Sequence, residues 1–155
     1  MTLAKIQSAF WWCADVMSPN KSDSRKLVEE ALGDRYQIES ELGEGSFGFV
    51  YRAKDESLNR IVAVKSLRFD PATDPELQED TRKRFLREAR VAAQLRHPNI
   101  VTIYDIISTP EASLIVMELV EGVTLQSVLA SKKRLGLDET IDILSQAAKA
   151  LDYAH

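Results

Sequence analysis

The sequence predicts an α+β fold in which a strand-rich region comes before a group of helices. Three segments have the apolar patterning of strands and follow one another closely: residues 36–42, 49–55 and 60–67. Residues 56–59, "ESLN", separate the second from the third and suit a hairpin turn, so consecutive antiparallel strands are expected. The spacing of apolar residues then changes from two to three or four, which indicates helices.

The composition is that of an ordinary globular protein, and 155 residues fit one domain of common size. A net charge of -4 and a pI near 5.3 argue against a general nucleic-acid binder. Cys13 is the single cysteine, so an internal disulfide is excluded and a reducing, cytoplasmic location is expected. No apolar run is long enough to span a bilayer, and Asp15 interrupts the best candidate for a signal peptide.

Residues 1–33 are expected to form a helical leader and linker before the strands. Between residues 2 and 17, apolar side chains at helical spacing share one face: Leu3, Ile6, Phe10, Cys13 and Met17. This helix either packs on the domain or frays, or it binds a partner or a membrane surface, although it lacks the basic face of a membrane helix. After a polar linker at 18–25, a short helix is expected with Ser24 as its N-cap and Gly33 as its end.

The region after the third strand contains one long helix and two more strands. "FDPATDP" at 69–75 breaks regular structure, and residues 76–95 then form an amphipathic helix that "RHPN" ends. Its buried side is expected to comprise Phe85, Leu86, Ala89, Ala92, Ala93 and Leu95. Two apolar strands are expected at 100–107 and 113–119, followed by a short helix at 124–131. A last helix has one apolar face: Leu137, Ile141, Leu144, Ala148 and Leu151.

Three glycines in "ELGEGSFGFVYRAKD" are the first candidate for a functional loop: Gly43, Gly45 and Gly48. The GxGxxG spacing also marks dinucleotide-binding folds, but there a helix follows the loop, whereas a strand follows here. The loop should therefore be a hairpin whose backbone amides can lie over phosphates. A tight or bulged hairpin without any ligand is the alternative for this loop taken alone.

A lysine and a glutamate strengthen the interpretation of the loop. Lys65 ends "VAVK" on the third strand, and its ammonium could reach phosphates beneath the glycine hairpin. Glu88 borders the apolar side of the long helix and could pair with it. Taken separately, a lysine that extends to solvent and a solvated glutamate would be the favoured interpretation, but the order of glycine loop, lysine and glutamate along the chain favours the functional one.

Five stretches together resemble the N-terminal lobe (N-lobe) of a eukaryotic-type protein kinase, most similar to bacterial serine/threonine kinases: "LGEGSFGFVY", "VAVK", "REARVAAQL", "HPNIV" and "LIVMELVEGVTL". The resemblance implies a five-stranded antiparallel sheet with one long helix at 34–122, which binds ATP. Residues 123–155 resemble the first helices of the C-terminal lobe (C-lobe). Protein serine or threonine side chains would be the substrate of the full-length enzyme.

The resemblance assigns roles residue by residue. The loop over ATP would comprise Gly43, Glu44, Gly45 and Gly48, with Ser46 and Phe47 at its tip. Lys65 would contact the α- and β-phosphates and pair with Glu88, and Met117 would lie behind the adenine. The backbone of Glu118 and Val120 would bind the adenine edge. Four apolar side chains would enclose the ring: Leu42, Val50, Ala63 and Leu119.

The sequence also departs from the kinase pattern. Neither His-Arg-Asp nor Asp-Phe-Gly occurs in it, and in the family these segments supply the catalytic aspartate and the Mg²⁺ ligands. This chain alone is therefore expected to be inactive, as a fragment of a longer kinase; a non-catalytic nucleotide-binding or interaction module is the alternative. His97 and His155 are expected to be structural, and the basic clusters at 82–84 and 132–134 to be solvated.

Overall fold

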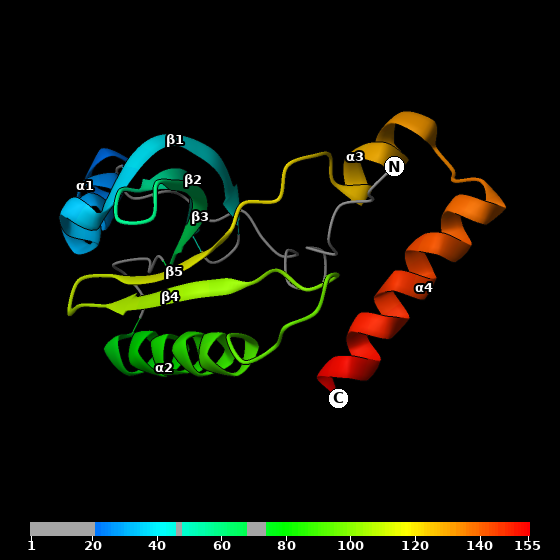
Figure 1. Cartoon of the computed structure of the whole chain (residues 1–155). Coiled ribbons are helices and arrows are strands. Elements are labelled where there is room, and N and C mark those ends of the chain that lie inside the picture. The colour runs from blue at the N-terminus through cyan, green and yellow to red at the C-terminus, as the bar shows by residue number, and fades with distance from the viewer. Residues whose placement is uncertain (1–20, 46–47, 68–73) are drawn as a thin grey trace. The chain divides into compact units, whose positions relative to one another are not determined.

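The computed structural model describes residues 21–45, 48–67 and 74–155, with side chains from Ser24 onward. The helix expected at residues 2–17 lies outside these ranges. The described residues form two compact units. A sheet unit contains residues up to 94 together with 103–119, and a helical unit contains 95–102 and 120–155. Figure 1 shows the elements of both units.

The sheet unit is built on one antiparallel sheet with the strand order β1-β2-β3-β5-β4. The strands are β1 (Tyr36–Gly45), β2 (Gly48–Asp55), β3 (Arg60–Ser66), β4 (Ile103–Ser108) and β5 (Ser113–Glu118). All five strands predicted from the sequence are present, which confirms the α+β class. β4 begins three residues later than expected, because the backbone of Ile100 donates to the carbonyl of His97 in a turn.

Helix α1 (Lys21–Leu32) packs on one face of the sheet. Val28 and Leu32 are buried there, in the core formed by alternate residues of the strands: Phe49, Tyr51, Ala53, Val62, Val64, Leu114 and Val116. Gly33 has φ +57° and ends the helix as expected, since a left-handed residue cannot continue it. Ser24 lies inside α1, so its prediction as the N-cap was wrong: the segment assigned to the linker is already helical from Lys21.

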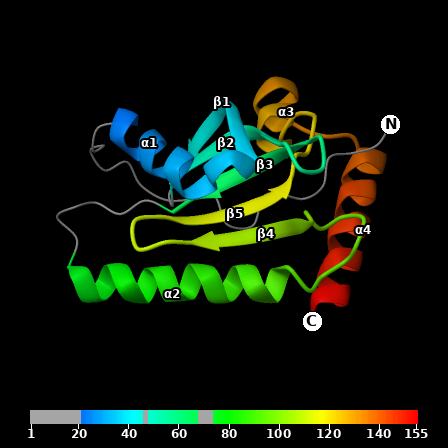
Figure 2. The same cartoon turned by 60° about the vertical axis from the view of Figure 1, so that its left-hand side comes forward.

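Helix α2 (Pro75–Ala92) packs against β4 and β5, and Figures 1 and 2 show it across the sheet from α1. Asp74 is its N-cap and accepts hydrogen bonds from the backbone of Glu76 and Leu77. Its buried residues are Leu86 and Ala89, while the other apolar residues of the expected face are only partly covered. The helix ends three residues early, because Gln94 N–H donates to Val91, a shorter turn than the α-helix makes.

The helical unit contains α3 (Leu125–Lys132), α4 (Leu137–Ala154) and the segment 95–102. Thr124 is the N-cap of α3, since its hydroxyl accepts from Ser127 N–H at 3.1 Å. The segment 95–102 is joined to α4 by two polar contacts and a ring contact. Arg96 N–H donates to the Tyr153 hydroxyl, Asn99 Nδ2 donates to Gln146, and the His97 and Tyr153 rings lie 5.4 Å apart.

Four of the apolar side chains expected to share one face of α4 are more than half exposed: Leu137, Ile141, Leu144 and Leu151. Ala150, on a different side of this helix, is buried. Within the described ranges, no helix combines the length and the apolar character that crossing a bilayer requires.

A polar cluster lies where β1, β2 and β3 meet at the end of the sheet next to Gly33. Asp55 is fully buried and accepts from Leu58 N–H, with Arg60 Nε 3.5 Å and Arg35 Nε 3.9 Å from its carboxylate. Arg35 also donates to Asp105 at 2.8 Å, as does the Tyr36 hydroxyl at 3.2 Å. Burial, together with the Asp105 charge, raises the pKa of Tyr36 to about 12, so this hydroxyl stays protonated and remains a donor.

Candidate functional site

The strand register places the glycine hairpin and Lys65 opposite one another across neighbouring strands of the sheet. Gly43 pairs with Val50, Val50 pairs with Lys65, and Lys65 pairs with Ile115. Residues directly opposite in antiparallel strands have their side chains on the same face. Lys65 therefore lies on the face of Val50, and its neighbours Val64 and Ser66 point to the opposite face, where α1 covers the core.

The neighbouring line of paired residues adds apolar surface beside Lys65. Ala63 lies two positions before Lys65 and pairs with Met117 of β5, which in turn pairs with Ile103 of β4. We call Val50, Ala63, Lys65, Ile115 and Met117 the lysine face. Its apolar members are all buried, so Lys65 lies between buried apolar residues on this face.

The charge of Lys65 is set by two opposing effects. Burial lowers the pKa of Lys65, because removing an ammonium from water disfavours its charged form. The carboxylate of Glu88 acts against this and raises the pKa of Lys65. Glu88 of α2 is thus a carboxylate whose charge favours the protonated form of Lys65, while the pairing of the two at a nucleotide stays a prediction from the sequence.

Glu88 lies in the second half of α2 and has a partner on its own helix. Arg84 Nε donates to Glu88 Oε1 at 2.8 Å, one turn away, and both side chains are exposed. An exposed pair of this kind contributes only about 0.3–0.5 kcal/mol. Glu88 can therefore exchange Arg84 for another cation at small cost.

The glycine hairpin is described on both sides of its tip, while Ser46 and Phe47 lie outside the described residues. A Cβ atom built on Gly43 would meet no atom within 4 Å, so open space lies over this position. Gly48 has φ +141°, which a side chain would strain. Ser66 secures the far side of the hairpin, because its hydroxyl exchanges two 3.2 Å hydrogen bonds with the backbone of Phe49.

Replacing Gly43 by valine is expected to leave the fold intact and to weaken the binding of a phosphate-bearing ligand. Valine suits a strand and has room here, but its methyl groups would occupy the space that a ligand needs. We expect the Kd of an ATP analogue to rise by about tenfold, or ~1.4 kcal/mol, with an unchanged melting temperature. A titration of both proteins with a fluorescent analogue tests this, and equal affinities would show that the open space is not used.

The remaining residues expected around adenine lie at two strand ends. Leu42 sits at a bulge of β1, between Glu41 and Gly43, and is 49% exposed. Met117 and Glu118 end β5, and Leu119 and Val120 follow the strand and are partly buried. The sheet unit ends at Leu119, while Val120 belongs to the helical unit. An exposed leucine next to buried Val50 offers apolar surface for a ligand ring to cover.

Sequence reasoning missed two side chains that act on this site. Ser66 was treated as an ordinary strand residue, although a small polar side chain in an apolar run is a sign of a specific hydrogen bond. Arg84 was assigned to a solvated basic cluster, yet it pairs with Glu88. Its position four residues before Glu88 was the available sign of that pairing.

Comparison with known proteins decides the family. Residues 36–155 match the model of the protein kinase domain. The chain belongs to the protein kinase family. PrkC of Bacillus subtilis, a serine/threonine-protein kinase, is 42% identical over 129 residues, 83% of this chain and 19% of the relative. PknB of Mycolicibacterium smegmatis is 42% identical over 128 residues, 80% of this chain and 20% of the relative.

The kinase domain is thus present in part, and the chain spans about a fifth of the length of these relatives. The five-stranded sheet with α2 is the kinase N-lobe, and α3 and α4 are the start of the C-lobe, as the sequence predicted. The match begins at Tyr36, so α1 precedes the kinase domain as the family model defines it.

Proposed function

We propose that the N-lobe of this chain binds ATP and that it belongs to a bacterial-type serine/threonine protein kinase. The observation that supports this most directly is the register that aligns Gly43, Val50 and Lys65 on the sheet face opposite the core. A phosphate chain under the glycine hairpin would meet backbone amides from above and the Lys65 ammonium from the sheet. Leu42, Val50 and Ala63 would supply apolar contacts to the adenine ring.

The electrostatics of Lys65 favour an anionic ligand. Lys65 is partly desolvated, so a phosphate that neutralises it would recover the free energy that burial costs the ammonium. Glu88 would keep the ammonium charged and oriented before the nucleotide arrives. Within the sheet unit, the backbone of Glu118, with Leu119 and Met117, would complete the adenine site, and the role expected for Val120 remains a prediction from the sequence.

Lys65→Ala is the test of the nucleotide site. The variant removes the ammonium and leaves the strand register and the core face in place, so it should fold. We expect it to lose binding of a fluorescent ATP analogue, with a Kd at least about tenfold weaker than that of the unmodified chain. Lys54→Ala is the matched control, since Lys54 is a strand lysine paired with Glu56 at 2.8 Å near the β2–β3 turn. Lys65→Ala that binds as well as Lys54→Ala would refute the proposal.

Protein kinases use Mg²⁺ together with ATP. In the part of the chain that the structure describes, no cluster of three or more acidic, histidine or cysteine side chains could hold a metal ion. Among the described residues, a Mg²⁺ ion would thus find at most one or two protein ligands at any place, together with the phosphates of the nucleotide. Phosphoryl transfer to a protein serine or threonine is proposed for the full-length kinase, by similarity to relatives that are named for it.

The 155-residue polypeptide is expected not to catalyse phosphoryl transfer. Its sequence lacks His-Arg-Asp and Asp-Phe-Gly, which in the family provide the residue that accepts the substrate proton and the metal ligands. Incubation with radiolabelled ATP, Mg²⁺ and a generic protein substrate should give no label above a Lys65→Ala control. Incorporation that depends on Lys65 would show that the chain is competent by itself.

We place this kinase portion in the cytoplasm, where ATP is supplied and where a lone cysteine stays reduced. A partner for the N-terminal aromatic helix, residues 2–17, remains a prediction from the sequence.

A further inference from the structure

Arg82 was expected to be solvated within the basic cluster 82–84, but its guanidinium reaches the β4–β5 turn. Its Nη1 donates to the carbonyl of Pro110 at 3.3 Å, and its Nη2 donates to the Ser108 hydroxyl at 3.0 Å and to the Thr109 carbonyl. The side chain is partly buried. Figure 2 shows the turn above the first half of α2, where Arg82 lies.

The turn that receives Arg82 is closed by its own hydrogen bonds. Thr109 N–H donates to Ala112 O at 2.8 Å, and Ala112 N–H donates back to the Thr109 hydroxyl at 3.0 Å. Two carbonyls and one hydroxyl thus converge on one planar guanidinium, a geometry that a lysine cannot reproduce. Arg82 contacts a preformed acceptor site.

The two halves of α2 are held to the sheet in different ways. Leu86 and Ala89 are its buried residues and lie in its second half, and the structure describes the whole of this helix. In the first half, Arg82 makes three hydrogen bonds to the β4–β5 turn. Apolar contacts in the second half tolerate small rotations of the helix, whereas hydrogen bonds to fixed carbonyls are directional. Arg82 therefore restricts the rotation and tilt of α2.

Rotation of α2 matters for Glu88, which lies at about 120° around the helix from Arg82, at the edge of the packed side. A residue at the edge moves toward or away from the sheet when the helix turns, while a residue at the centre stays in contact. We infer that Arg82 is a positioning residue that holds α2 in the rotation from which Glu88 acts on Lys65. This inference rests on the proposed role of the Lys65–Glu88 pair in nucleotide binding.

The test measures the coupling between Glu88 and Lys65 with and without Arg82. The 155-residue chain is labelled with ¹³C-lysine, and the Lys65 signal is assigned with Lys65→Arg and titrated by NMR without nucleotide. Glu88→Gln should lower the pKa of Lys65, because it removes a favourable charge. In a chain that already carries Arg82→Ala, Glu88→Gln should lower the pKa of Lys65 by a clearly smaller amount. Comparing the two differences cancels the direct effect of the Arg82 charge.

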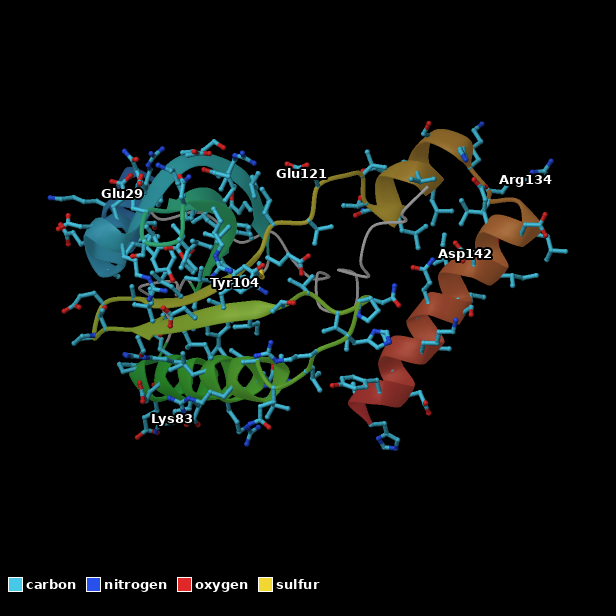
Figure 3. The ribbon with its side chains drawn as sticks, in the orientation of Figure 1. Glu29, Lys83, Tyr104, Glu121, Arg134 and Asp142 are labelled. Atoms are coloured by element: carbon cyan, nitrogen blue, oxygen red, sulfur yellow. The ribbon has the colours of Figure 1, made fainter. Side chains whose placement is uncertain are left out.

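Two variants control for charge and for folding. Lys83→Ala removes the adjacent cation, which lies on the side of α2 away from the strands (Figure 3) and pairs only weakly with Glu79 at 3.7 Å. It should leave the effect of Glu88→Gln at its original size. Arg82→Lys keeps the positive charge but loses the planar guanidinium with its several donors. It should therefore restore the coupling between Glu88 and Lys65 only in part. If Arg82→Ala does not fold, Arg82→Lys decides by the same comparison.

The inference would be overturned if Glu88→Gln lowered the pKa of Lys65 equally with and without Arg82. It would also be overturned if Glu88→Gln left the pKa of Lys65 unchanged in the chain that keeps Arg82. A titration with the fluorescent ATP analogue separates this result from the proposed function. If Lys65→Ala binds the analogue normally, the nucleotide site is refuted, while the pKa comparison still decides the role of Arg82. If the site is real, Arg82→Ala should bind several-fold more weakly than Lys83→Ala.

Discussion

Leu32→Ala is expected to destabilise the sheet unit by about 3 kcal/mol, although Leu32 precedes the residues that match the kinase family. Leu32 is 4% exposed and is packed with Val28 among the strand residues of the core. Truncating it removes three buried carbon atoms, and the surrounding strands cannot close the resulting cavity because their register holds them. The helix that contains it is thus part of the folded unit.

Urea unfolding followed by circular dichroism measures this loss as a lower midpoint with an unchanged slope. Leu27→Ala is the matched control, since Leu27 lies on the same helix but is 40% exposed, and it should cost less than about 1 kcal/mol. Equal midpoints for the two variants would mean that α1 does not contribute to the core in solution.

Asp55→Ala is expected to cost about 3 kcal/mol as well, for an electrostatic reason. The carboxylate is fully buried at the end of β2, with Arg60 and Arg35 at 3.5 and 3.9 Å and Leu58 N–H at 3.2 Å. Without it, Arg60 would keep a partly buried charge next to the Tyr104 ring, over which its guanidinium lies at 3.6 Å. The β2–β3 turn would also lose the acceptor for Leu58.

Thermal unfolding of Asp55→Ala, Asp55→Asn and Glu56→Ala separates these contributions. Asparagine can still accept from Leu58 N–H but carries no charge, so its stability should lie between that of the unmodified chain and that of Asp55→Ala. Glu56→Ala removes only an exposed pair with Lys54 and should cost less than about 1 kcal/mol. If Asp55→Ala unfolds at the same temperature as Glu56→Ala, the buried carboxylate is not stabilising.

Much of the fold could be predicted from the sequence, because its signals are local. The alternation around Tyr51 and the dense run that includes Val62 identified the strands, and Gly33 identified the end of α1. The order of glycine hairpin, Lys65 and Glu88 favoured a phosphate site, and five sequence stretches together indicated the kinase family, which the comparison then confirmed. Each of these features is a pattern within a few residues or a fixed order along the chain.

The sequence by itself determined the type of each element, the family, and the residues proposed to bind ATP. The tertiary structure alone decided that α1 covers the core face and that Lys65 aligns with Val50 and Gly43. It also decided that Arg82 donates hydrogen bonds to the β4–β5 turn. The physical reason is that periodicity reports which face of an element is apolar, whereas register and helix docking depend on contacts between residues far apart in sequence. Arg82 and Pro110, 28 positions apart, meet only once the sheet has formed.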